Sequence, residues 1–289
     1  MKAPDFDYTK PRSLDEVFAL LAEYGDEARL LAGGQTLMAT LNMRLSEPAL
    51  LIDITGIDAL RGIAVKDGAL RIGALATHTE IESAALVAQH APLLGMAAPH
   101  IAHRAIRNLG TLGGSIAYAD PAAEWPTCAL ALDATVICCG ADGTRRIAAA
   151  DFFLDLYTTA LRPGELVLAC DFPLAASGER FHFDELARRH GDYAIAGLAL
   201  ASRFEQGLMR RTRIALMGIA TTPVRARRTE ALLDGRAVDA AVIAEAASLL
   251  AEELDGALKP VADLINSSAT KRHLATVLLR RALATFIAG

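Results

Sequence analysis

The chain has 289 residues, of which 53% are hydrophobic and 22% charged, and its formal net charge is −5. This composition indicates a folded globular protein of more than one domain and excludes a disordered chain. The negative net charge argues against nucleic-acid binding, which needs a basic surface.

Neither a secretion signal nor a membrane span is expected. Residues 1–7 lack the apolar core of a signal peptide, and no uncharged apolar run reaches the ~18 residues that a span needs. We therefore expect a cytoplasmic protein. The four cysteines lack C-x-x-C spacing, so they are predicted to be reduced and buried rather than to hold an iron–sulfur cluster.

The first third of the sequence alternates helix and strand signals, after an irregular segment at 1–12. Ser13-Leu-Asp-Glu16 is a capping box that begins a helix, and Gly25 ends it. A short apolar strand at 28–32 leads directly into Gly33-Gly34, and a helix is expected from Thr36 to Met43. A second, buried strand is expected at 50–54.

The middle third predicts mixed structure. Residues 64–66 and 69–73 form a hairpin around an Asp-Gly turn, and a second capping box at Thr77 begins a helix that ends near His90. The other predicted elements are helical pieces at 93–107, a glycine-rich loop from 108, a helix at 122–133, and strands at 134–139 and 166–172.

A change in composition at 173–178 marks a predicted domain boundary. Strand patterns follow at 181–186, 195–204 and 211–218, and two helices follow at 239–254 and 268–287. Three strands followed by two helices predict a small α+β domain with its helices on one face of the sheet.

Two glycine segments stand out as candidate binding sites. The first glycine segment, residues 32–36, reads Ala-Gly-Gly-Gln-Thr; the second, residues 108–124, contains Gly110, Gly113 and Gly114 beside Thr111 and Ser115. Neither has the G-x-G-x-x-G or Gly-Lys-Ser/Thr spacing of the common nucleotide motifs. A strand, a glycine turn and the start of a helix nevertheless present free amides to an anion, so the two segments are predicted to bind one ligand together.

Both segments resemble motifs of one known family. Residues 32–45 with 51–54 are similar to the first FAD-binding segment of the molybdenum hydroxylases, and residues 106–115 with 119–124 are similar to the second. The likeness is to the medium, FAD-binding subunit and continues through 188–194 and 222–226, so it spans nearly the whole chain.

The resemblance implies an α+β fold in two parts. Residues 1–175 would form a vanillyl-alcohol-oxidase or PCMH-type FAD-binding domain with subdomains at about 1–56 and 57–175. Residues 176–289 would form a C-terminal domain of the carbon monoxide dehydrogenase flavoprotein type, with a three-stranded sheet and helices.

The resemblance also implies which residues contact FAD. In the family the backbone of both segments surrounds the FAD diphosphate, a carboxylate at the position of Glu124 contacts the cofactor further along, and an aromatic residue at the position of Tyr193 lies near the flavin ring. The implied contacts are Leu31, Ala32, Gly33, Gly34, Gln35, Thr36, Leu37, Thr111, Gly113, Gly114, Ser115, Ala119, Glu124 and Tyr193. Thr36 replaces a common Ser and keeps its hydroxyl, whereas a lysine that some relatives carry is absent where Asp184 and Glu185 stand.

Other candidate groups have plain structural explanations. His100 and His103 have a spacing found in metal sites but no third ligand nearby in the sequence, so no metal site is predicted. Arg104 and Arg107 would either neutralise a phosphate or form salt bridges. No paired nucleophile and base indicates hydrolysis, and no catalytic side chain is assigned.

The resemblance implies a function in electron transfer. A partner large subunit would carry molybdenum with a pterin, a small subunit would carry two [2Fe–2S] clusters, and FAD in this chain would pass electrons to an external acceptor. Two alternatives stay open on the residues alone: a self-sufficient FAD-dependent oxidoreductase that acts on a small molecule, and a flavin-free scaffold in which the glycine segments are only turns.

Overall fold

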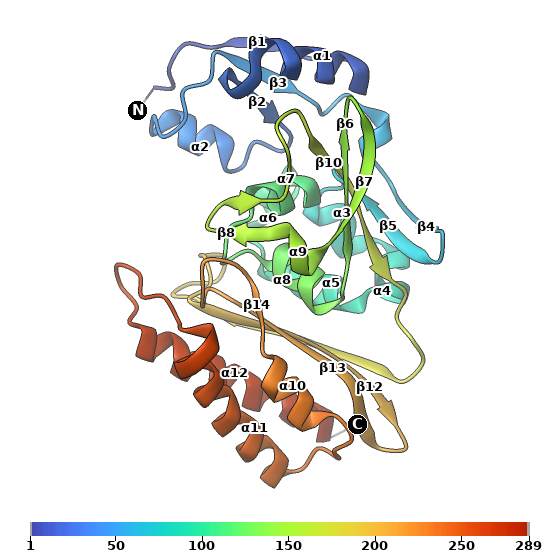
Figure 1. The fold of residues 1–289 in the computed structure, drawn as a ribbon, viewed down its shortest axis with the longest axis vertical. Helices are drawn as coiled ribbons and strands as arrows, with labels where there is room; N and C mark the ends of the chain where they lie inside the picture. The colour runs from blue at the N-terminus through green and yellow to red at the C-terminus, as the bar shows by residue number, and fades with distance from the viewer. Residues whose placement is uncertain (1, 288–289) are drawn as a thin grey trace.

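A computed structural model describes residues 2–287 of the chain. Three larger sheets are stacked along its long axis, with the N-terminal residues at one end and the C-terminal helices at the other (Figure 1).

The N-terminal subdomain is built on a three-stranded parallel sheet. Its order is β1-β3-β2, with β1 at Asp7–Thr9, β2 at Ala28–Leu31 and β3 at Leu50–Asp53. All four residues of β3 are buried, as expected for a central strand. The helices are α1 (Leu14–Tyr24), capped by Ser13 as predicted, and α2 (Leu37–Asn42), with a 3₁₀ turn at Gly25–Glu27.

The second subdomain is a five-stranded antiparallel sheet covered by short helices. Its order is β4-β5-β10-β6-β7, and β8 and β9 form a separate small hairpin. The strands are β4 (Ile63–Lys66), β5 (Ala69–Gly73), β6 (Thr135–Gly140), β7 (Gly143–Ala148), β8 (Phe153–Asp155), β9 (Thr158–Thr159) and β10 (Leu166–Pro173). The helices are α3 (His78–Ser83), α4 (Ala85–His90), α5 (Pro92–Ala97), α6 (Arg104–Arg107), α7 (Leu112–Tyr118), α8 (Glu124–Ala131) and α9 (Ala149–Phe152), with 3₁₀ turns at Asp58–Leu60 and at Ala98–His100 (η3).

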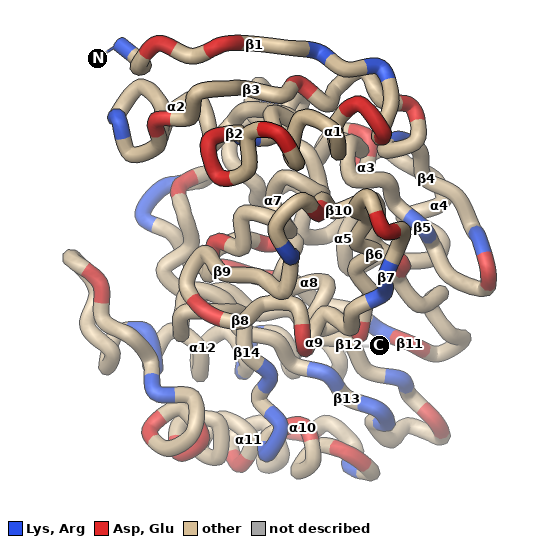
Figure 2. The backbone as a smooth tube through the Cα atoms, turned by 45° about the horizontal axis from the view of Figure 1, so that its top comes forward, with Lys and Arg blue, Asp and Glu red and all other residues tan. Residues whose placement is uncertain are grey.

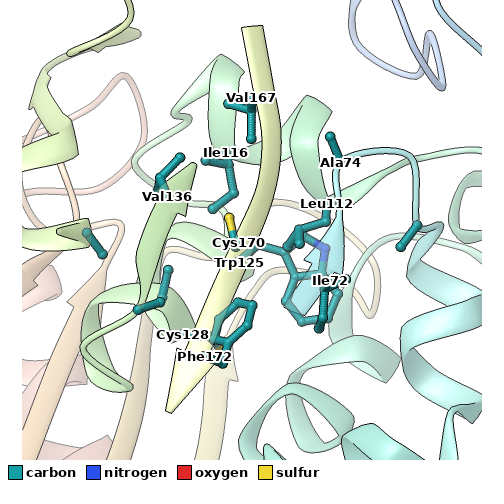
Figure 3. Packing of buried hydrophobic residues seen from close by; sticks show 14 of the residues in the cluster. Ile72, Ala74, Leu112, Ile116, Trp125, Cys128, Val136, Val167, Cys170 and Phe172 are labelled. Atoms are coloured by element: carbon teal, nitrogen blue, oxygen red, sulfur yellow. The ribbon is translucent and has the colours of Figure 1, made fainter. Parts of the chain in front are cut away.

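The core of this subdomain lies between the sheet and helices α7 and α8. Figure 3 shows Ile72 of β5 and Phe172 of β10 packed with Leu112, Ile116 and Trp125 of the helices. All of these side chains are fully buried. The four cysteines are free and buried, as predicted, and all four belong to this hydrophobic cluster.

The C-terminal domain is a four-stranded antiparallel sheet between two layers of helices. The strands are β11 (Glu179–Leu186), β12 (Ala196–Glu205), β13 (Leu208–Met217) and β14 (Val224–Arg225). Its helices are α10 (Arg227–Leu233), α11 (Ala240–Glu253) and α12 (Ser268–Ile287), with a π-helical turn at Leu254–Leu258.

Alternation along the central strands explains this layered arrangement. On β12, Leu198 and Leu200 face the core with α11 and α12, whereas Ala199 and Ala201 face the core shared with the FAD-binding half. Successive strand residues point to opposite faces, so a run of apolar residues indicates a sheet buried on both sides. The small alanines allow α5 and α8 to pack close to the sheet.

Several sequence-based expectations about elements were wrong. Residues 7–9 form a strand rather than an irregular segment, and β14 adds a fourth strand to the predicted three, because pairing with a distant partner stabilises segments with weak local signals. The helix that begins after Thr77 is broken at Ala84, the predicted 122–133 helix begins only at Glu124, and α10 was not predicted. No helix between residues 2 and 287 is long and apolar enough to cross a membrane.

Candidate functional site

The two glycine segments lie in direct contact. A Cβ atom placed on Gly33 would lie 2.0 Å from the carbonyl oxygen of Leu109 and 2.9 Å from Cα of Gly110. Only glycine fits such an approach, because the obstructing atoms belong to the backbone and cannot move aside. The structure therefore places side by side two segments that are far apart in the sequence.

The first glycine segment leaves a row of backbone amides free. No residue of the described chain accepts a hydrogen bond from the amides of residues 33–37, which run from the turn after β2 into the first turn of α2. Gly34 has a φ of +71° that lets the chain turn here, and the Gln35 side chain donates to the Gly33 carbonyl at 2.7 Å. The result is a fixed turn whose N–H groups are available to an anion.

The second glycine segment is a helix start, not the loop that was predicted. Thr111 is the N-cap of α7, and its Oγ accepts from the Gly114 amide at 3.1 Å. The amide of Leu112 donates to Ala76 and that of Gly113 to Ala74, at 2.9 and 2.8 Å. These amides are thus already in use, and α7 forms despite its glycines because tertiary contacts outweigh weak helix propensity.

The glycines of α7 serve close packing. A Cβ on Gly113 would lie 2.4 Å from Cβ of Ala74, next to β5. Gly114 is exposed and Ser115 is half-buried, whereas Thr111 is buried, so this end of α7 presents a small surface and the Ser115 hydroxyl rather than a set of free amides.

A buried pair, His78 and Trp125, packs against Gly110 of the second glycine segment; sequence reasoning missed this pair. Trp125 Nε1 donates to His78 Nδ1 at 2.8 Å, and a Cβ on Gly110 would lie 2.6 Å from the His78 ring. Burial, assisted by the nearby Arg107, lowers the pKa of His78 to about 4, so the ring is neutral. Nothing local in the sequence signals this pair, because its members are far apart in the chain.

The chain leaves α7 through a left-handed residue and enters an acidic turn. Ala119 has a φ of 53°, and Asp120 accepts a hydrogen bond from the Ala122 amide at 2.8 Å. Glu124 is the first residue of α8. Burial, with a smaller contribution from the neighbouring Asp120, raises the pKa of Glu124 to about 7.

Three tyrosines from separate segments gather around this turn. The rings of Tyr118 and Tyr157 have centroids 5.0 Å apart. Partial burial, together with the neighbouring Asp120, Tyr118 and Tyr193, raises the pKa of Tyr157 to about 12. Tyr193, on the loop between β11 and β12, is 70% exposed. An aromatic, acidic surface thus adjoins the end of α7, and Tyr193 is the residue that the C-terminal domain contributes to it.

Other candidate residues have structural partners. Arg107 donates to Glu82 at 3.1 Å and to the carbonyl of Ile101 at 3.0 Å, so it stabilises the loop before α6 and does not face the glycine segments with a free charge. His100 lies near Glu185, and His103 packs against Gly191. Among residues 2–287, no three His, Cys, Asp or Glu side chains are arranged to hold a metal ion.

Comparison with known proteins identifies this arrangement. Residues 4–175 match the family described as the FAD binding domain in molybdopterin dehydrogenase, and residues 181–286 match the CO dehydrogenase flavoprotein C-terminal domain. The chain belongs to the FAD-binding medium subunits of the molybdenum hydroxylase family. As predicted, it is the FAD subunit of an oxidoreductase, and its cofactor is FAD.

Two relatives match this medium subunit over nearly their whole length. The 6-hydroxypseudooxynicotine dehydrogenase complex subunit alpha of Paenarthrobacter nicotinovorans is 38% identical, over 98% of this chain and 95% of its own. The carbon monoxide dehydrogenase medium chain of Hydrogenophaga pseudoflava is 34% identical, over 98% of this chain and 97% of its own.

Solved structures of the family share the fold. The medium subunit superposes on a chain of carbon monoxide dehydrogenase from Hydrogenophaga pseudoflava with a TM-score of 0.95, at 35% identity and coverage of 100% of this chain and 99% of that one. For quinoline 2-oxidoreductase from Pseudomonas putida 86 the TM-score is 0.94, at 36% identity and the same coverage. The predicted fold class is thereby confirmed.

Proposed function

We propose that this medium subunit receives electrons from a partner subunit and passes them through FAD to an external acceptor. In this proposal a small subunit with two [2Fe–2S] clusters delivers electrons to FAD in this chain, and a large subunit with molybdenum and a pterin oxidises the substrate. Support comes from the relatives, which are named as subunits or medium chains of dehydrogenases.

The contact between Gly33 and Leu109 is the observation that carries the cofactor assignment. It brings the free amides of residues 33–37 next to the N-terminal end of α7, where Thr111, Gly113, Gly114 and Ser115 lie. An FAD diphosphate needs N–H donors and a surface without bulky side chains, and this place offers both. We assign the diphosphate to these residues, with Leu31, Ala32 and Leu37 at the ends of the turn.

The remaining contacts extend from α7 toward the C-terminal domain. We assign Ala119 and Glu124 to the part of FAD beyond the phosphates, and Tyr193 to the side of the flavin ring. Because the pKa of Glu124 is raised to about 7, this carboxyl is only partly ionised near neutral pH and adds less negative charge beside an already anionic cofactor. The exposed Tyr193 offers an aromatic face to a planar ring system.

The role of the protein is to bind and orient rather than to transfer protons. FAD supplies the chemistry, because it exchanges electrons singly or in pairs. The cysteines are buried and their thiols are stabilised in the neutral form, so redox chemistry is left to bound cofactors.

Purification of the tagged chain from its native source tests the proposal. We expect two further polypeptides to co-purify, together with FAD near-stoichiometric to this chain, molybdenum, and iron with acid-labile sulfide equivalent to two [2Fe–2S] clusters. The control is the same chain produced alone in a foreign host, which should carry FAD without molybdenum or iron. A chain that purifies from its source alone and turns over a substrate by itself would contradict the proposal and favour a self-sufficient flavoenzyme.

A further inference from the structure

Strand β11 is an edge of the C-terminal sheet. In the order β11-β12-β13-β14 it has a strand partner on one side only. Just before β11 the Phe204 amide donates to the Gly178 carbonyl at 2.8 Å, and this bond fixes which residues of β11 pair with β12. Because bonded pairs alternate along an antiparallel ladder, the N–H and C=O groups of Phe181 and Phe183 point away from β12. Within residues 2–287 no backbone group outside the sheet forms a hydrogen bond with them.

A groove of about 860 Å³ runs along this free edge. Residues 179–183 of β11 all line it. Side chains alternate between the two faces of a sheet, so consecutive lining residues show that the groove follows the edge and not one face. Its walls are Pro92 and Met96 of α5 on one face, and Thr285 and Phe286 of α12 on the other. A further strand beside β11 would lie between these two walls.

The two sides of the groove differ in polarity. Phe181, which is half-buried, and Phe183, which is buried, form an apolar wall with Met96 on the side of the FAD-binding half. On the other side His182 lies beside Thr285, with Nδ1 and Oγ1 3.4 Å apart. The second ring nitrogen of His182, Nε2, is buried and has no hydrogen-bond partner among the described residues. Burial lowers the pKa of His182, so the ring is neutral near pH 7 and its Nε2 atom awaits a polar partner.

An extended peptide segment is the occupant that fits this groove. Its backbone can pair with the outward groups of β11, and its alternate side chains then lie on opposite faces of the sheet. A second copy of the chain does not fit, because its own β11 lies between the same two walls. The helices of the two copies would meet before their strands reached the pairing distance of about 4.8 Å.

We propose that β11 binds an extended segment of a partner subunit, which becomes a fifth strand of the C-terminal sheet. The segment has apolar side chains on the Phe181 face and a hydrogen-bonding side chain beside His182. Both halves of the chain line the groove, so the bound segment contacts the FAD-binding half and the C-terminal domain at once. This attachment rests on the proposed function, from which the partner subunits come, and it adds the place where one of them is held.

Hydrogen exchange of single amides tests this attachment, measured on the chain produced alone and on the complex purified from its source. In the chain alone the Phe181 amide should exchange quickly, because it lacks an acceptor, while the His182 amide is protected by its bond to β12. In the complex the Phe181 amide should exchange at least about tenfold more slowly. The His182 amide is the internal control, because an added strand bonds only to the outward groups and leaves its exchange nearly unchanged.

A charge in the groove should prevent the attachment. Met96 is 43% exposed, so M96R puts a guanidinium into the apolar wall without disturbing the core. In the preparation that carries M96R, the Phe181 amide should return to the exchange rate of the chain alone. V65R is the matched control, because Val65 is 46% exposed and also lies on an edge strand, β4, and it should leave the Phe181 amide protected.

A synthetic peptide gives a second readout, which requires no partner subunit. The probe alternates valine with asparagine, has lysines at its ends, and should slow exchange of the Phe181 amide in the chain alone; the same peptide N-methylated on its pairing edge should not. Equal exchange of this amide in the chain alone and in a complex that contains its partner subunits would overturn the inference, as would protection of the amide in a chain that forms a dimer by itself. Absence of partner subunits would instead contradict the proposed function, and the probe would still decide whether β11 accepts an extended segment.

Discussion

At the scale of single residues, Arg225 connects the two halves of the molecule. Its Nε and Nη2 donate to the two oxygens of Glu230 at 2.5 and 2.9 Å, and its Nη1 donates to Asp133 at 2.9 Å and to the Leu130 carbonyl at 3.2 Å. In Figure 2 basic positions are concentrated on β13 and between β14 and α10, the region from which Arg225 reaches the FAD-binding half. A planar guanidinium can serve several acceptors at once, which a lysine cannot.

Replacing Arg225 tests how much this connection stabilises the fold. Glu230 would remain buried, with an 8% exposed side chain and no full ion-pair partner, so R225M should lower the free energy of unfolding by about 3–5 kcal/mol. R227M is the matched control, since Arg227 is 62% exposed and lies 3.7 Å from the same Glu230; its cost should stay below about 1 kcal/mol. Urea unfolding measures the free energy of unfolding of both variants. Equal losses in R225M and R227M would show that the buried ion pair of Arg225 stabilises the fold no more than an exposed one does.

Sequence reasoning located residues by their local neighbours and missed those defined by distant ones. The segment 222–226 was recognised as similar to the family, yet nothing in it indicated that Arg225 pairs across the domain boundary, because its partners Asp133 and Leu130 lie more than 90 residues earlier. The same limit applies to the bond between His78 and Trp125. The capping box at Thr77 was predicted correctly, because it is formed within four consecutive residues. At Ser13 only the N-cap half of the predicted box forms, because the Glu16 side chain accepts from the Arg12 amide instead of the Ser13 amide.

At the scale of elements, the site depends on how a strand–turn–helix unit meets a second helix. The order strand, glycine turn, helix could be predicted for residues 28–43 because each part has its own local pattern. The helix at residues 112–118 could not be predicted in this way, because glycine has a poor helix propensity and α7 is stabilised by its contacts with Ala74 and Ala76. The sequence therefore singled out two segments that the structure brings into contact, but it did not show which of them offers free amides.

Substituting Gly33 tests the contact between the glycine segments. In G33A the new methyl group would overlap the Leu109 carbonyl and force the two segments apart, so FAD affinity should fall at least about tenfold, equivalent to ~1.4 kcal/mol. The control is G95A. Gly95 lies in helix α5 and its added Cβ would meet nothing within 4 Å, so this substitution should stabilise the chain by about 0.5–1 kcal/mol. Flavin titration and thermal unfolding measure the two effects, and unchanged FAD affinity in G33A would refute the assignment.

At the scale of the whole molecule, oppositely shifted pKa values make the stability depend on pH. The pKa of His78 in the folded state lies below its unfolded value, so the unfolded chain binds more protons and this residue costs stability as the pH falls below about 6.5. Glu124 and Glu185 have raised pKa values, so their contribution is fully present below the unfolded pKa of 4.5 and is lost as the pH rises from there to about 7 and about 8. The two effects therefore oppose each other between about pH 4.5 and about pH 6.5, and above that range only the loss from the carboxyls remains.

The acid limit can be assigned to His78 by substitution. H78Q keeps an acceptor for Trp125 but does not titrate, so it should remove a loss on the order of 3 kcal/mol that the unaltered chain shows between about pH 6.5 and about pH 4. The measurement is the free energy of unfolding in urea at a series of pH values. If the two curves run parallel through this range, the loss must come from carboxylates elsewhere.

The contact of Gly33 with Leu109 also fixes when the cofactor can enter. During synthesis the turn after β2 leaves the ribosome long before Leu109 and the start of α7, and its amides then face water alone. In the proposed placement of FAD, the complete binding surface exists only after the second subdomain has folded against the first. Flavin loading would then be a late step in the biogenesis of this subunit.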